Sequence, residues 1–178
     1  MANQSTVCCI GCSICLLLVA LILVLVSIGT VEPIEYGIAY NAITKKVDTD
    51  AVYPGGWYFI GPTTSFITYP STYINLDFTH YPGAQAQPLT VKDKGGQDIV
   101  LSMSIQYKLQ EENIGKLYSE YQKTYETNYI NFIDSVVRKE VGKFNSTAFW
   151  TDRQASGNIL RAAIDERLSQ TYANCNNL

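Results

Sequence analysis

A long apolar run near the N-terminus is the feature that most constrains this chain. Residues 7–31 contain no Asp, Glu, Lys, Arg, His or Pro, and the first charged side chain is Glu32. At 1.5 Å per residue, about 25 residues form a helix of roughly 37 Å, which exceeds the about 30 Å of a hydrocarbon core. A helix also satisfies its own backbone polar groups, as lipid requires. We therefore expect a transmembrane helix over residues 7–31 of a single-pass integral membrane protein.

Two other interpretations of the run are a cleaved signal peptide and a re-entrant hairpin. The leader, residues 1–6, has no Lys or Arg, and the run is longer than the about 7–15 apolar residues of a signal peptide, although residues 27–29 resemble a cleavage site. No Pro or paired Gly breaks the middle of the run, which disfavours a hairpin. Neither flank carries an excess of Lys or Arg, so the sequence leaves the orientation open.

The composition of the remaining chain excludes several classes of function. Residues 32–178 have the size of one ordinary domain. The formal net charge is -3 with both signs interspersed, so there is no basic face for nucleic acid. Outside the N-terminal segment the only cysteine is Cys175, which fits a reducing compartment better than a disulfide-stapled secreted domain.

The hydrophobic period changes from strand-like to helical at Glu111. Alternating apolar residues predict strands at 34–41 and 73–78 and a hairpin whose arms are 89–93 and 99–109. Two further strands are expected at 57–60 and 65–69, between the turn residues 54–56, 61–62 and Pro70. Helical periodicity predicts helices at 111–122, 124–144 and 151–172, the last opened by a capping box of Thr151 and Gln154. Residues 45–53 are polar and receive no element. These patterns indicate an α+β fold with a strand-rich half near the membrane and, in the distal half, helices packed on a β-hairpin.

Five pieces of the sequence, in this order and behind an apolar segment, resemble the SPFH or band-7 superfamily of stomatins, prohibitins and flotillins. No single piece is specific, because Pro-Gly turns and alternating strands are common, but their order is. The pieces are Glu35–Tyr40, Tyr53–Pro62, Tyr69–Phe78, the hairpin Leu89–Leu109, and the helix Ile130–Gly142 that is followed in register by Arg153–Leu168.

This resemblance implies an SPFH (PHB) domain over residues 32–178, apparently without the last strand and the coiled coil of the family. It also implies a non-enzymatic scaffold without a cofactor, which assembles with copies or paralogues to organise a membrane patch and regulate embedded partner proteins. The alternative is a fixed accessory subunit of a large membrane complex, for example a mitochondrial respiratory assembly. The expected location is the plasma or endosomal membrane or the mitochondrial inner membrane.

Few residues outside the N-terminal segment are candidates for catalysis, metal binding or modification. The only histidine, His80, lies beside Tyr81-Pro82 and is expected in a loop, and no catalytic, phosphate-binding or metal-ligand pattern is present in residues 32–178. Asn145 begins a glycosylation sequon, which matters only if this side of the membrane is lumenal.

Four cysteines at the start of the apolar run carry the main modification hypothesis. Helical spacing places Cys8, Cys12 and Cys15 on one face with Cys9 beside them. Juxtamembrane cysteines are the usual acceptors of S-acylation. The alternatives are simple packing of small side chains against a neighbouring helix or lipid and, less well supported, a metal site or a disulfide.

Tyrosines are frequent in the membrane-proximal half. They suggest either anchoring at the lipid headgroups or, equally, strand propensity and contacts between subunits. The residues concerned are Tyr36, Tyr40, Tyr53, Tyr58, Tyr69 and Tyr73.

Overall fold

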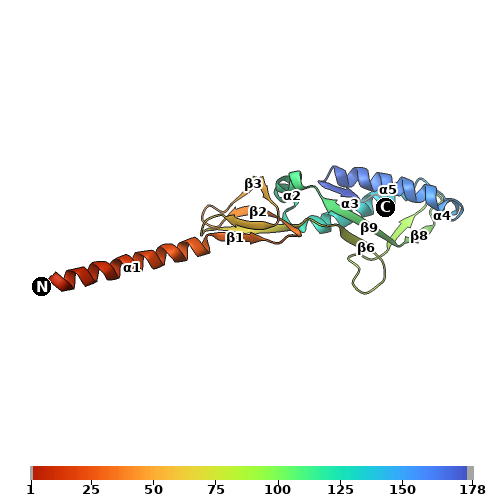
Figure 1. The fold of residues 1–178 in the computed structure, drawn as a ribbon. Helices are drawn as coiled ribbons and strands as arrows, with labels where there is room; N and C mark the ends of the chain where they lie inside the picture. The colour runs from red at the N-terminus through yellow and green to blue at the C-terminus, as the bar shows by residue number, and fades with distance from the viewer. Residues whose placement is uncertain (1, 176–178) are drawn as a thin grey trace. The chain divides into compact units, whose positions relative to one another are not determined.

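The computed structural model describes the backbone of residues 2–175 and the side chains of residues 13–175 apart from Ala148. The chain forms two compact units, residues 1–69 and residues 70–178 (Figure 1). The α+β fold class predicted from the sequence is confirmed, since each unit combines strands with at least one helix.

The first unit consists of one helix and two small sheets. Helix α1 (Ala2–Val26) is followed by β1 (Ile28–Val31), β2 (Glu35–Asn41), β3 (Lys46–Tyr53), β4 (Gly56–Phe59) and β5 (Thr64–Pro70). Strand β1 pairs with β4, and the other sheet has the order β3-β2-β5. Its core contains Ile38 and Tyr69, which are both almost fully buried, together with Val31 and Tyr36.

The predicted membrane span needs correction. Its last residues, 28–31, leave the helix and form β1, because their backbone pairs with β4 from Ile28 opposite Phe59 to Val31 opposite Gly56. Within the part of the chain that the structure describes, no helix has the length and apolarity needed to cross a membrane, so the structure does not support the span predicted over residues 7–31.

The second unit is built around a three-stranded antiparallel sheet with the order β10-β9-β6. Its strands are β6 (Ile74–Phe78), β9 (Met103–Leu109) and β10 (Ala173–Cys175). A separate hairpin is formed by β7 (Leu89–Lys92) and β8 (Asp98–Leu101). Residues 173–175, to which the sequence analysis assigned no element, thus complete an edge of the main sheet.

The helices of this unit follow β9. A 3-10 turn (Glu111–Asn113), α2 (Ile114–Tyr121) and a second 3-10 turn (Gln122–Thr124) lead into α3 (Tyr125–Val141), which is followed by α4 (Ser146–Thr151) and α5 (Arg153–Ser169). Helix α3 packs on α5 and β7, and α5 also contacts β10 (Figure 1). The core lies along the buried face of α3, which presents Tyr125, Tyr129, Ile133, Val137 and Val141.

Three local predictions differ from the structure. The long arm 99–109 is two strands, because the chain leaves the β7–β8 hairpin at Ser102 and joins the main sheet as β9. The residue that caps α5 is Asp152 and not Thr151, since its Oδ1 accepts a hydrogen bond from the Ala155 amide at 3.1 Å. The polar segment 45–53 contains strand β3, which pairs with β2.

Candidate membrane-facing surface

An exposed apolar patch lies on the two-stranded sheet that follows α1. Trp57 is 80% exposed, Phe59 is 73% exposed and Ile28 is 40% exposed. The register places Ile28 opposite Phe59 and Thr30 opposite Trp57, so these side chains share one face of the sheet. We call Ile28, Trp57 and Phe59 the aromatic patch.

Close packing at Gly29 of β1 and Gly37 of β2 explains why the patch points outward. A Cβ atom at Gly29 would lie 2.5 Å from Cδ1 of Ile60 and 2.8 Å from the ring of Phe66. A Cβ atom at Gly37 would meet Val31 and the same ring. The inner face is therefore too close-packed for a side chain at Gly29, and the large side chains of this sheet that remain exposed lie on the other face.

Tyrosines fill the interior of this unit instead of its apolar surface. Tyr53, Tyr58 and Phe66 pack edge-on or tilted against one another with ring centroids 5.0–5.8 Å apart. Tyr36 and Tyr69 are buried. Headgroup anchoring is therefore wrong for Tyr36 and Tyr69, whereas Tyr73, at the start of the second unit, is exposed. In the described part of the first unit, Trp57 and Phe59 are the exposed aromatic side chains, and the sequence did not indicate them.

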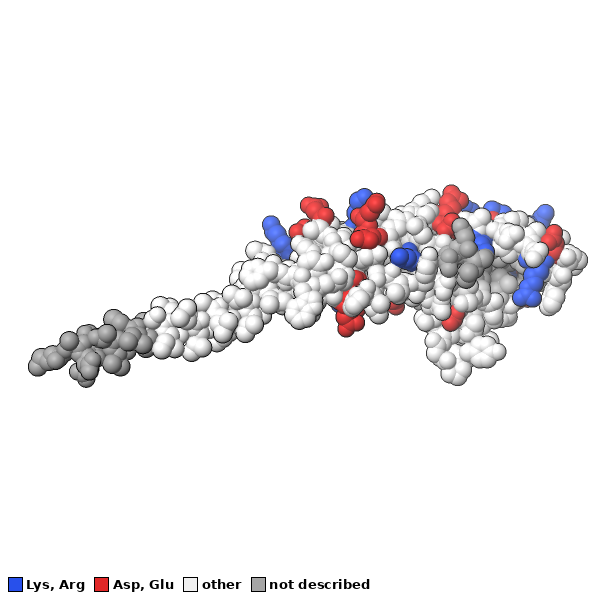
Figure 2. Space-filling model, in the orientation of Figure 1, with Lys and Arg blue, Asp and Glu red and all other residues white. Residues whose placement is uncertain are grey.

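Helix α1 ends directly beside the patch. Its described side chains, residues 13–26, are uncharged, and all of them are exposed (Figure 2). Ser27 closes the helix, because its amide donates to the carbonyl oxygen of Leu23 and its hydroxyl donates to the same oxygen at 2.6 Å. An uncharged helix thus continues, through one buried residue, into the strand that carries Ile28.

The predicted modification residues are only partly described. All four N-terminal cysteines belong to α1, and Cys15 has an exposed free thiol. The side chains of Cys8, Cys9 and Cys12 lie outside the described residues. Asn145 is exposed at the residue before α4, and His80 is exposed in the segment after β6. Among the described side chains, no group of three or more His, Cys, Asp and Glu could hold a metal ion.

The family to which the chain belongs bears on what this surface contacts. The model of the SPFH domain / Band 7 family matches residues 30–172. The chain belongs to the SPFH domain / Band 7 family. A search of curated proteins finds no match to it. The SPFH match begins within β1 and extends into both units, so Trp57 and Phe59 of the aromatic patch lie inside it and Ile28 lies two residues before it. Membership indicates a membrane-associated, scaffold-type function in general.

Proposed function

We propose that this SPFH-domain protein is a non-enzymatic membrane scaffold that associates with the lipid surface through α1 and the aromatic patch. Copies or paralogues assemble side by side, organise a patch of membrane and regulate the proteins embedded in it. The observation that carries the proposal is the continuity of an uncharged helix with an exposed apolar sheet face in an SPFH domain.

The chemistry of the patch favours lipid as its partner. Trp is enriched at membrane–water interfaces, where the ring sits at the headgroup level. Large exposed apolar patches on otherwise polar proteins mark sites of protein or membrane interaction. The patch follows α1 after a single residue, Ser27, so a bilayer that contacts the exposed apolar side chains of this helix also lies close to Ile28.

S-acylation of the N-terminal cysteines would strengthen this anchor. Each acyl chain adds about 0.8 kcal/mol per buried methylene group. We propose Cys8, Cys9, Cys12 and Cys15 as acceptors, supported by their spacing on α1 and by the exposed thiol of Cys15. Hydroxylamine-sensitive mass on the N-terminal peptide, from membranes of the native source, is the expected result. An N-terminal peptide of unmodified mass would contradict acylation.

The two tryptophans of the chain allow a direct test of the membrane contact. The only tryptophans are Trp57, in the patch, and Trp150, which is 88% exposed on α4. Full-length Trp150→Phe and Trp57→Phe each keep a single fluorophore. In vesicles with brominated acyl chains we expect Trp57 fluorescence to shift to the blue and to be quenched. Trp150, a control of equal type and similar exposure, should be quenched much less. Equal quenching of both, or none of Trp57, would contradict the proposal.

The mass of the extracted complex and its crosslinks test the proposed assembly of subunits. The gently extracted protein should migrate as a complex far larger than its 19.8 kDa, with crosslinks from residues 32–110 to other chains. A monodisperse monomer without crosslinked neighbours would contradict the scaffold while leaving the lipid contact of Trp57 intact.

A further inference from the structure

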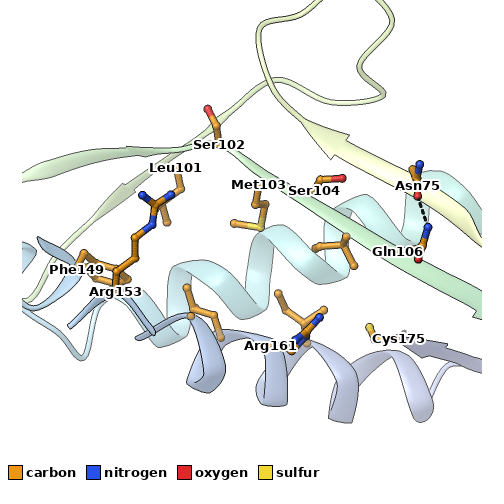
Figure 3. A pocket seen from close by; sticks show the side chains of 14 residues that line it. Asn75, Leu101, Ser102, Met103, Ser104, Gln106, Phe149, Arg153, Arg161 and Cys175 are labelled. Carbon is orange, nitrogen blue, oxygen red and sulfur yellow. Dashed lines mark hydrogen bonds between the residues drawn. The ribbon is translucent and has the colours of Figure 1, made fainter. Parts of the chain in front are cut away.

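A groove of about 450 Å³ lies between α5 and the strands β8 and β9 of the second unit (Figure 3). Leu101, Met103 and Ile105 form its floor, because alternate residues of an extended chain share one face. Leu160 and Ile164 of α5 form the opposite wall. The volume falls within the about 300–1,000 Å³ of small-molecule sites, which are mostly apolar with a few polar groups.

A glycine on α5 helps to keep the groove open. Gly157 lines it, and a Cβ atom built there would meet no heavy atom within 4 Å. Glycine in a helix interior is unfavourable by about 1 kcal/mol relative to alanine. Helix α5 thus has glycine, the residue type that favours helices least after proline, at position 157, where a larger side chain would occupy empty space.

The charge around the groove has one sign. Its lining contains Arg153 and Arg161 and no Asp or Glu. Arg161 lies toward the end formed by Cys175, where the Asp165 carboxylate accepts a hydrogen bond from the Cys175 amide at 3.1 Å. Arg153 lies at the other end, and its guanidinium extends toward Leu101 and Ser102 (Figure 3).

Arg153 is the cation available to a ligand. No ion pair joins it to any side chain in the described part of the chain. It is also the first residue of α5, where the helix dipole favours an anion. The adjacent Asp152 carboxylate is engaged with the Ala155 amide and does not line the groove.

We propose that this groove binds a medium-chain fatty acid, with the carboxylate on Arg153 and the acyl chain along Leu101, Met103 and Ile105 toward Ile164. Charge complementarity selects this occupant, because an apolar floor with one unpaired cation at its end matches an amphiphile with a single anionic head. The site is independent of the aromatic patch and of α1, since every residue that lines it belongs to the second unit.

Photocrosslinking of the full-length protein in lipid nanodiscs tests the site. The probe is a dodecanoic acid that carries a diazirine and an alkyne, and mass spectrometry locates the label. We expect label on residues 101–106 or on α5. Unlabelled dodecanoate should compete about fivefold better than dodecanol, since a solvent-exposed ion pair contributes up to about that factor.

Two variants and a control make the result decisive. Gly157→Leu should fill the groove and abolish labelling while circular dichroism shows a folded domain. Arg153→Gln should reduce labelling about fivefold and should remove the preference for dodecanoate over dodecanol. Lys116→Gln, an exposed cation on α2 outside the groove, should leave labelling unchanged.

Three outcomes would overturn the proposal. The first is undiminished labelling of a folded Gly157→Leu variant. The second is equal competition by dodecanoate and dodecanol. The third is crosslinking of residues 101–106 to a second copy of the chain, because this would assign the groove to an interface between subunits.

Discussion

The carbonyl oxygen of Ser27 accepts a hydrogen bond from the backbone amide of Ile60 at 3.0 Å. The Gly61 amide donates to the same oxygen at 3.2 Å, and Ser27 is 3% exposed. The end of the apolar helix is therefore held by the strand region that carries Trp57 and Phe59. This connection makes the packing around β1 the natural place to test how the anchor and the domain are joined.

Gly29→Ala should destabilise this junction. The new Cβ atom would fall 2.5 Å from Cδ1 of Ile60 and 2.8 Å from the Phe66 ring, so side chains must shift. Overpacking of this kind costs about 1–3 kcal/mol. The measurement is the free energy of unfolding in urea. Gly157→Ala is the control, because its Cβ atom meets nothing and helix propensity improves by up to about 1 kcal/mol. Equal stability of the two variants would show that the inner face of β1 is not close-packed.

Two neighbouring buried tyrosines should respond differently to loss of their hydroxyl groups. The Tyr129 hydroxyl donates to the carbonyl oxygen of Thr171 at 2.6 Å, whereas the buried Tyr107 hydroxyl has no hydrogen-bond partner among the residues that the structure describes. Tyr129→Phe should lower the free energy of unfolding by about 1 kcal/mol or more. Tyr107→Phe should leave it unchanged or raise it by about 1 kcal/mol, because an unsatisfied polar group is removed. Urea midpoints measure both, and a clear loss of stability in Tyr107→Phe would refute the assignment.

The stability of the second unit should fall in acid through Asp93. Its carboxylate accepts hydrogen bonds from the Ser146 amide at 2.9 Å and from the Gln97 amide at 2.8 Å, and these lower the pKa of Asp93 below its ordinary value. The stabilisation is fully present above the unfolded pKa of about 3.9 and is lost as pH falls from there through the lower folded pKa.

The matched variant for this prediction is Asp93→Asn, which cannot ionise. Melting temperatures of the natural protein and the variant should differ clearly at pH 6. The difference should shrink once the pH falls below about 4. A difference that is constant from pH 6 to pH 2 would show that the charge of Asp93 contributes nothing.

Positions on one face of β9 should differ in their tolerance of a charge. Leu109 is 2% exposed, whereas Ile105 is only half-buried because it lines the groove. Leu109→Asp should cost several kcal/mol and prevent folding, since it buries an unpaired carboxylate. Ile105→Asp should cost less, because water in the groove reaches the carboxylate. Thermal melts of the two variants decide this, and equal losses would mean that the groove is closed in solution.

The sequence predicted which residues share this strand face, but not how far each is buried or which strands pair: Leu101, Met103 and Ile105 were expected to face the core, and they line the groove instead. The alternation correctly indicates one shared face for Leu101, Met103, Ile105 and Leu109, and Leu109 at the end of this face is buried. The alternation continues in phase through Ser102, so periodicity contains no sign that the chain changes sheets there. Pairing with β6 depends on residues far apart in sequence, which a local pattern does not report.

For the aromatic patch, too, the local sequence pattern predicts the strand but not which side of it is exposed. The geometry of a strand separates Trp57 and Phe59 from Tyr58, but a continuous apolar run such as 57–60 does not indicate which face is inside. That choice depends on Gly29 and on the ring of Phe66, which occupy the inner side. The tyrosines were the more numerous aromatic signal, yet Tyr36 and Tyr69 serve the core.

Strand β10 makes the order of synthesis matter for this protein. The first unit has all of its strands once residue 70 is made, whereas β9 lacks its pairing partner on one side until Ala173–Cys175 have left the ribosome. Until then β9 offers an open edge, the feature by which nascent chains pair with one another. A nascent chain halted before residue 173 would therefore be the species that most needs a chaperone.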